Sequence, residues 1–204
     1  MFTWQHTLKA PIVKLREDPN KIVTALAYVI KLAQENGKKA SQYELVKTLF
    51  LADRQHLNEW GRLITHDNYV AMNHGPVPSL AFDILKETSK GLNSIPGKRT
   101  PWKRQAEQHK SSKYYIYYDA KEIEFENFLS DSDLDCLKRN LNVVQTLGFA
   151  QIRKLTHEDA AYVDAWDDTS SRRQFPMSLG MLFDTPNFEK ATELAEISSF
   201  AQRR

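Results

Sequence analysis

The sequence lacks the features that would tie it to a membrane or to an oxidising compartment. Its 204 residues include one cysteine, Cys136, so no disulfide can form within the chain and a reducing compartment is expected. No apolar run approaches the roughly 18 residues of a membrane span. The first residues also lack the basic start and long apolar run of a secretory signal. We therefore expect a cytoplasmic protein without a membrane contact.

Glycine is scarce as well, with seven residues in the whole chain. Neither of the glycine-rich loops that hold phosphates in nucleotide-binding proteins occurs, so no cofactor is expected. The formal net charge is only +2, which is too small to favour nucleic acid as a partner.

What the chain does contain is an ordinary globular composition, with 41% hydrophobic and 26% charged residues. This balance excludes wholesale disorder, and the length permits one good core with a small appendage. The apolar residues recur mostly at helical spacing. The predicted fold class is mainly α, a compact helical domain with a small antiparallel β-sheet or hairpin.

Two helices are well marked near the start. Residues 21–36 place apolar side chains on one helical face, and Gly37 suits the position after a helix end. Ser41 followed by Glu44 is a capping box, which predicts that a second helix begins there and runs to about Trp60. A third helix is expected to open at Pro78 and to end near Gly91.

The remaining pattern is more mixed. Ser130 and Asp133 mark the start of a helix that should end at Gly148. Residues 95–113 hold prolines and six basic side chains and are expected to form a linker or exposed loop. Further helical segments are expected at residues 150–155, 160–166 and 187–204.

Strand propensity is concentrated in two segments. The run of residues 114–118, Tyr-Tyr-Ile-Tyr-Tyr, favours a strand, and the extended segment 68–73 is its expected partner. The Gly-Pro-Val-Pro run at residues 75–78 is expected to be a stiff connecting loop, because proline fixes φ and glycine frees it.

Several side chains invite an enzymatic interpretation. The candidate ligands of a metal site are His56, His66, His74, His157, Asp53, Asp67 and Asp159. No metal-binding motif with its required spacing is present, however, which favours surface or capping histidines over a metal hydrolase. Cys136 lies among leucines and is expected to be a partly buried structural thiol.

A nucleic-acid interpretation has two possible supports. The basic stretch 98–113 includes Trp102, which could stack on a single strand, although a solvated loop is the favoured interpretation. The helix pair over residues 21–60 resembles a helix-turn-helix in outline, yet its second helix offers only Lys47 and Arg54 against several carboxylates. An acidic run follows the basic stretch, and neighbouring patches of opposite sign suit a charged protein partner.

A combination of short motifs resembles the SocA-like Panacea domain of bacterial and phage antitoxins. The pattern comprises K-x-x-[FY]-L-A-D, a glycine, I-T-x-D-x-Y-x-A-x-x-x-G-P-V-P, and L-T-H ahead of a tryptophan. The matching residues are Lys47, Phe50, Leu51, Ala52, Asp53, Gly61, Ile64, Thr65, Asp67, Tyr69, Ala71, Gly75, Pro76, Val77, Pro78, Leu155, Thr156, His157 and Trp166.

The resemblance implies a mainly helical fold and a non-enzymatic antitoxin. Such a protein neutralises a co-encoded toxin by direct protein contact, in some cases as an adaptor that delivers the toxin to an ATP-dependent protease. The alternative is a helix-turn-helix-like DNA-binding transcriptional regulator.

The expected organisation is an N-terminal arm over residues 1–19, the Panacea domain over residues 20–168 and a C-terminal extension over residues 169–204. The arm is expected to pack through Phe2, Trp4 and Leu8. Asp53 is expected to hold the Gly75 to Pro78 loop by accepting hydrogen bonds. The candidate partner-binding or motif residues are Lys47, Asp53, Arg54, Tyr69, His74, Gly75, Pro76, Val77, Pro78, Thr156, His157 and Trp166.

Overall fold

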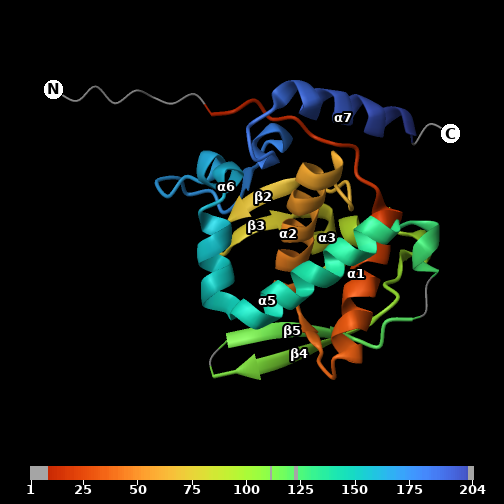
Figure 1. The fold of residues 1–204 in the computed structure, drawn as a ribbon. Helices are drawn as coiled ribbons and strands as arrows, with labels where there is room; N and C mark the ends of the chain where they lie inside the picture. The colour runs from red at the N-terminus through yellow and green to blue at the C-terminus, as the bar shows by residue number, and fades with distance from the viewer. Residues whose placement is uncertain (1–8, 111, 122–123, 202–204) are drawn as a thin grey trace.

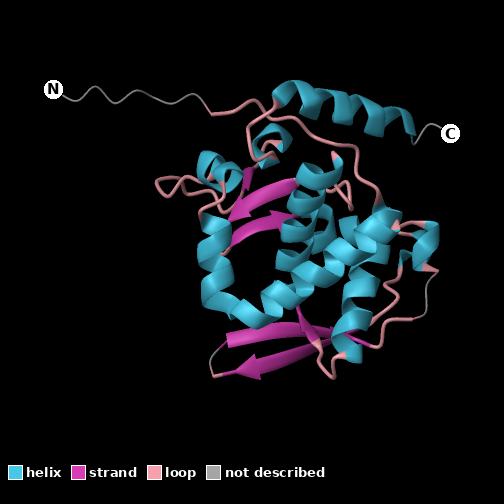
Figure 2. Cartoon of the chain, in the orientation of Figure 1, coloured by secondary structure: helices cyan, strands magenta, loops and turns pink. Residues whose placement is uncertain are grey.

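The computed structural model describes residues 9–110, 112–121 and 124–201. It is mainly helical, with two small antiparallel sheets at opposite sides of a helical centre (Figures 1 and 2). The predicted fold class is therefore confirmed. The predicted contacts of Phe2, Trp4 and Leu8 lie outside the described residues.

The first two helices form where the sequence predicts them, although α1 begins two residues before its predicted start. Helix α1 spans Pro19–Glu35 and is capped by Asp18, whose side chain accepts hydrogen bonds from the first backbone N–H groups. Helix α2 spans Gln42–Trp60, and both halves of the Ser41 and Glu44 capping box are formed. Helix α2 is central in the fold (Figure 1) and contributes buried side chains to two hydrophobic clusters.

One sheet contains strands β2 (Tyr69–Met72), β3 (Gly75–Pro78) and β6 (Phe175–Pro176) in the order β3-β2-β6. Two predictions were wrong here. The Gly-Pro-Val-Pro run is a strand in a tight hairpin with β2, and β2 does not pair with residues 114–118. The two prolines are tolerated because β3 is an edge strand. It has a partner strand on one side, so the missing N–H groups break no hydrogen bonds to a second neighbour.

The second sheet contains β1 (Ala40–Ser41), β4 (Lys103–His109) and β5 (Ser112–Tyr118) in the order β1-β5-β4. The predicted linker is therefore wrong in part, since it contributes the whole of β4. The low β propensity of Lys-Arg-Gln-Ala-Glu-Gln-His is offset by pairing along all of β5. Trp102 is buried in the core, so it is not available for stacking on a nucleic acid.

The region predicted as one helix up to Gly91 forms two, α3 (Ser79–Leu85) and α4 (Ser89–Ser94). The chain turns between them at Glu87, which has a φ of 55°. Thr88 caps α4 through the backbone N–H of Gly91. A short 3₁₀ helix, Pro96–Lys98, follows.

Helix α5 spans Asp131–His157 and begins at the predicted start signal, where Ser130 and Asp133 form a capping box. It does not end at Gly148, as predicted, but bends there and continues. Cys136 on this helix is fully buried, which agrees with a structural thiol.

One of the remaining elements precedes α5, and the others follow it. They are the 3₁₀ helix Phe125–Asn127, helix α6 (Ala160–Ala165), the 3₁₀ helix Leu179–Leu182 and helix α7 (Phe188–Ala201). Helix α7 lies beside the N-terminal segment (Figure 1), and the backbone N–H of Arg16 donates to the Ser198 hydroxyl. Within the described residues no helix combines the length and the apolar character needed to cross a bilayer.

Candidate functional site

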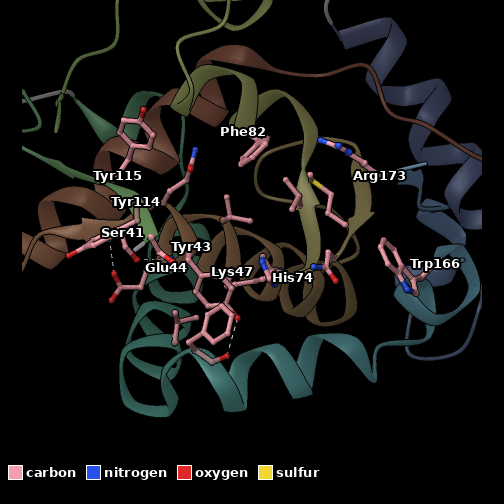
Figure 3. Close-up of a pocket in the computed structure, with 18 of the residues that line it drawn as sticks. Ser41, Tyr43, Glu44, Lys47, His74, Phe82, Tyr114, Tyr115, Trp166 and Arg173 are labelled. Carbon is pink, nitrogen blue, oxygen red and sulfur yellow. Dashed lines mark hydrogen bonds between the residues drawn. The ribbon is translucent and has the colours of Figure 1, made fainter. Parts of the chain in front are cut away.

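A half-open groove with a volume of about 1120 Å³ separates the two sheets. Its walls come from the first turns of α2, the β2–β3 turn, the start of β5, the middle of α5 and the segment 166–173. Figure 3 shows Lys47 and His74 midway along the groove, with Tyr114 and Tyr115 towards one end and Trp166 towards the other. The lining is mainly apolar and aromatic, so the few polar groups that reach it define its chemistry.

Gly148 shapes one wall of the groove by bending α5. Its φ of 69° and ψ of −178° are far from helical values, and glycine adopts this conformation without a steric penalty. The bend brings Phe149 against Tyr43, with ring centroids 4.7 Å apart, and the Tyr43 hydroxyl donates to the Phe149 carbonyl. The helix thus curves around the groove instead of passing it.

Lys47 is the buried cation of the groove. Its side chain is 1% exposed, and its Nζ donates one hydrogen bond of 2.8 Å to the Pro76 carbonyl. Within the described parts of the chain, no carboxylate forms an ion pair with it. Burial lowers the pKa of the Lys47 ammonium to about 7, because the charged form loses its hydration without gaining a counter-ion.

Gly75 allows the β2–β3 hairpin to close against Lys47. Its φ is 95°, and a Cβ at this position would lie 2.7 Å from both Lys47 Nζ and Thr156 Oγ1. Thr156 is itself held by its hydroxyl, which donates to the Ile152 carbonyl at 2.9 Å. Three separate motif segments, around Lys47, Gly75 and Thr156, therefore meet at one point.

Next to Thr156, His157 begins a row of aromatic rings in contact with one another. Its ring lies 4.4 Å from that of Tyr162, Tyr162 stacks on Trp166 at 5.8 Å, and Trp166 meets Phe175 edge-on. The Nε2 atom of His157 is buried without a hydrogen-bond partner among the residues described. Burial, reinforced by nearby Arg153, lowers the pKa of His157, which favours the neutral ring.

Asp53 has a different environment, although it lies on the same helix as Lys47. It is fully buried and accepts hydrogen bonds from Ile64 N (2.7 Å), Thr65 N (2.9 Å) and Tyr69 Oη (2.7 Å). The Thr65 hydroxyl donates to it as well. Burial raises the pKa of the Asp53 carboxyl, and these four donors oppose the rise.

The expectation that Asp53 holds the Gly75 to Pro78 segment was wrong. Asp53 fixes the turn after α2 and the first residue of β2, while the Pro76 carbonyl is held by Lys47. The sequence predicted that the Asp53 carboxylate accepts hydrogen bonds. It could not show which of two nearby segments supplies the donors.

Asp67 caps α3. This buried carboxylate accepts hydrogen bonds from Leu80 N (3.0 Å) and Ala81 N (2.7 Å). Burial raises its pKa to about 7, against the effect of these N–H groups. Asp67 is one of the residues of the family motif, and its role in the structure is to cap α3.

The other predicted site residues fall into three groups. His74, Val77 and Trp166 line the groove with Lys47. Tyr69 and Pro78 face one another in the β2–β3 ladder, and Tyr69 is buried. Arg54 lies outside the groove and forms ion pairs with Asp159 at 2.6 Å and Asp184 at 2.8 Å.

The histidines proposed as metal ligands are dispersed. His56 is fully buried and interacts with the Arg62 carbonyl, Ser132 and Asp133, whereas His74 is exposed at the groove. No group of three or more histidine, cysteine or carboxylate side chains within the described ranges is arranged to hold a metal ion.

Sequence reasoning missed the part of the groove built by the C-terminal segment and by α5. Arg172, Arg173 and Phe149 line it there, and Tyr43 at the start of α2 packs against Phe149. The only available signal was an aromatic residue directly after a glycine within a helical pattern, at Phe149. The arginines had no motif that marked them.

Comparison with known proteins identifies the family. No curated protein and no solved structure matches the chain. The model of the family described as "Antitoxin SocA-like, Panacea domain" matches residues 45–162, which is more than half of the chain. This range contains Lys47, the β2–β3 hairpin, β5 and the bend of α5, and the chain accordingly belongs to the SocA-like antitoxin family with the Panacea domain.

Proposed function

We propose that this protein is an antitoxin that neutralises a co-encoded toxin by direct protein contact at the groove. The observation that carries the proposal is the family match over residues 45–162. The groove supports it, because an aromatic and apolar lining with a few polar groups suits the anchoring of a protein segment. The proposed role is non-enzymatic.

The two ends of the chain are proposed to choose the toxin. Residues 169–204, proposed as a C-terminal extension, contribute Ser170, Arg172 and Arg173 to the groove. The segment just before α1 packs on this extension, since the Ser178 hydroxyl donates to the Pro11 carbonyl. A change in the exposed residues of the C-terminal segment, such as Arg172 and Arg173, would therefore alter the groove rim directly.

The DNA-binding alternative gains no support from the geometry. Of the two basic residues on the would-be recognition helix, Lys47 is buried and Arg54 is neutralised by two aspartates. A helix that reads DNA needs exposed, unpaired cations along one face.

Co-expression tests the proposed function. The product of the neighbouring gene is expressed alone and together with this protein, and colony formation is counted. We expect growth arrest with the neighbour alone and rescue by co-expression. Absence of toxicity, or toxicity that persists at verified expression of both chains, would contradict the proposal.

Neutralisation by direct contact has two forms, occlusion of the toxin and delivery to an ATP-dependent protease. The half-life of the toxin in growing cells separates them. Delivery shortens it in the presence of the antitoxin and requires the protease, whereas occlusion leaves it unchanged or longer.

A further inference from the structure

The basic side chains of the groove outnumber its carboxylates and are not ion-paired within the described residues. Four basic side chains line it, namely Lys47, Lys113, Arg172 and Arg173. None of them forms an ion pair with any residue in the described ranges. Lys113 and the two arginines are exposed, so only Lys47 holds its charge away from water.

The carboxylates of the groove are already engaged elsewhere. Glu44 accepts the backbone N–H of Ser41 in the capping box. Asp167 accepts from the backbone and hydroxyl of Thr169, and Asp168 accepts from the Trp166 indole at 2.5 Å. These bonds stabilise local turns, and none of the three carboxylates forms an ion pair with a cation of the groove among the described residues.

Lys47 is also short of acceptors. An ammonium has three N–H donors, and Nζ has one acceptor, the Pro76 carbonyl, among the described residues. The charged or titratable side chains around it are Tyr43 and Glu44 on its own helix, His74 on the hairpin, Arg153 and His157 on α5, and Asp168 in the segment after α6. Neither carboxylate forms an ion pair with Nζ, so the ammonium has no direct counter-ion among the described residues.

The size of the groove indicates a peptide segment as its occupant. Sites for small molecules usually enclose about 300–1000 Å³, and this groove reaches about 1120 Å³ while remaining half-open. Phe149 in its wall is 53% exposed, and Val143 and Leu147 nearby on α5 are 39% and 38% exposed. Exposed apolar residues beside a groove are typical of a surface that another protein covers.

We propose that the groove binds an acidic segment of the partner protein, with an Asp or Glu carboxylate on the Lys47 ammonium and a neighbouring apolar side chain against Tyr43 and Phe149. This inference rests on the proposed function, because it names the chemistry of the toxin segment. The carboxylate supplies both the missing charge and the missing acceptors of Lys47. Arg172 and Arg173 at the rim attract the same acidic segment before it docks.

Calorimetric titration with the purified product of the neighbouring gene tests this assignment. Lys47→Met keeps the length of the side chain and removes its charge, and we expect affinity to fall about tenfold to a hundredfold. Lys138→Met is the matched control, since Lys138 is exposed on α5 outside the groove. We expect its affinity to equal that of the wild type.

The double variant Arg172→Met/Arg173→Met provides a second measurement on exposed residues, where folding is not at risk. We expect a loss of severalfold in affinity and a weaker dependence of binding on salt concentration. If Lys47→Met does not fold, this variant decides the question. An unchanged affinity and salt dependence would then overturn the proposal.

Replacement of each toxin carboxylate by its amide identifies the group on Lys47. One such substitution should weaken binding to the wild type and have no further effect on Lys47→Met. Proton uptake gives an independent signature, because the free ammonium has a pKa of about 7. Between pH 6.5 and pH 8.5 wild-type affinity should fall about tenfold or more, and the affinity of Lys47→Met should fall by much less over the same range.

The outcomes separate the two proposals. If the toxin binds the wild type, Lys47→Met and the double arginine variant equally well, the acidic-segment assignment is wrong and the antitoxin function stands. If the wild type does not bind the toxin at all, both are wrong.

Discussion

Helix α2 carries two buried charged side chains with opposite surroundings. Asp53 is met by four donors from the turn and strand that follow the helix. Lys47, almost two turns earlier, has one acceptor and faces a groove. A buried charge that is fully hydrogen-bonded stabilises a fold, whereas one that is left short of partners is costly unless a ligand completes it. The comparison therefore assigns Asp53 to the fold and Lys47 to binding.

The largest effect is expected for Asp53→Ala. The substitution removes the acceptor of four buried donors and leaves a small cavity, so the free energy of unfolding should fall by about 3–5 kcal/mol. Urea unfolding measures it. Asp135→Ala, which removes an exposed carboxylate of α5, should change stability by less than about 0.5 kcal/mol. Equal stability of the two variants would refute the structural role of Asp53.

Gly75→Ala tests the close approach at the motif junction. The new Cβ would collide with Lys47 Nζ and Thr156 Oγ1 and would sit at a φ of 95°, so we expect a loss of about 3 kcal/mol. Gly37→Ala is the control for positive φ alone, since its φ is 70° and its Cβ would meet nothing within 4 Å. It should lose about 1 kcal/mol, and an equal loss in both variants would show that the junction has room.

Lys47 makes the free energy of unfolding depend on pH. At pH 9 the ammonium is protonated in the unfolded chain and mostly neutral in the folded one, because its folded pKa is about 7. The unfolded state binds more protons, so this residue makes stability rise by about 2 kcal/mol from pH 7 to pH 9. Urea unfolding at both values should show this rise in the wild type relative to Lys47→Met. Parallel pH profiles would mean that Lys47 titrates normally.

The smallest effect is expected for Tyr69→Phe. The change removes one of the four donors to Asp53 and keeps the ring that packs on Phe50. Stability should fall by about 1 kcal/mol, and the double variant with Asp53→Ala should lose less than the sum of the single losses. Additive losses would indicate that the hydroxyl and the carboxylate act independently.

The sequence predicted the elements that depend on local chemistry. The capping box at Ser41 and the helix start at Ser130 form as expected, because a cap is satisfied within three residues of itself. The role of the Asp53 carboxylate as a hydrogen-bond acceptor was also predicted, although its donors come from a different segment.

Features that depend on distant partners were not predictable. Strand β4 has little strand propensity and forms because β5 pairs along its whole length. The Gly75 to Pro78 segment is a strand because Tyr69 to Met72 lies opposite. The groove itself needs the bend at Gly148 and the arrival of residues 166–173, which no local pattern encodes.

The most direct test of the contrast between Lys47 and Asp53 is a paired measurement on Lys47→Met at pH 7. Its free energy of unfolding is determined by urea titration, and its ability to rescue cells from the neighbouring gene product is determined by colony counts. We expect stability within about 1 kcal/mol of the wild type, because an apolar side chain replaces an unpaired buried charge, together with loss of rescue. A stable variant that rescues as well as the wild type would contradict the assignment of Lys47 to binding.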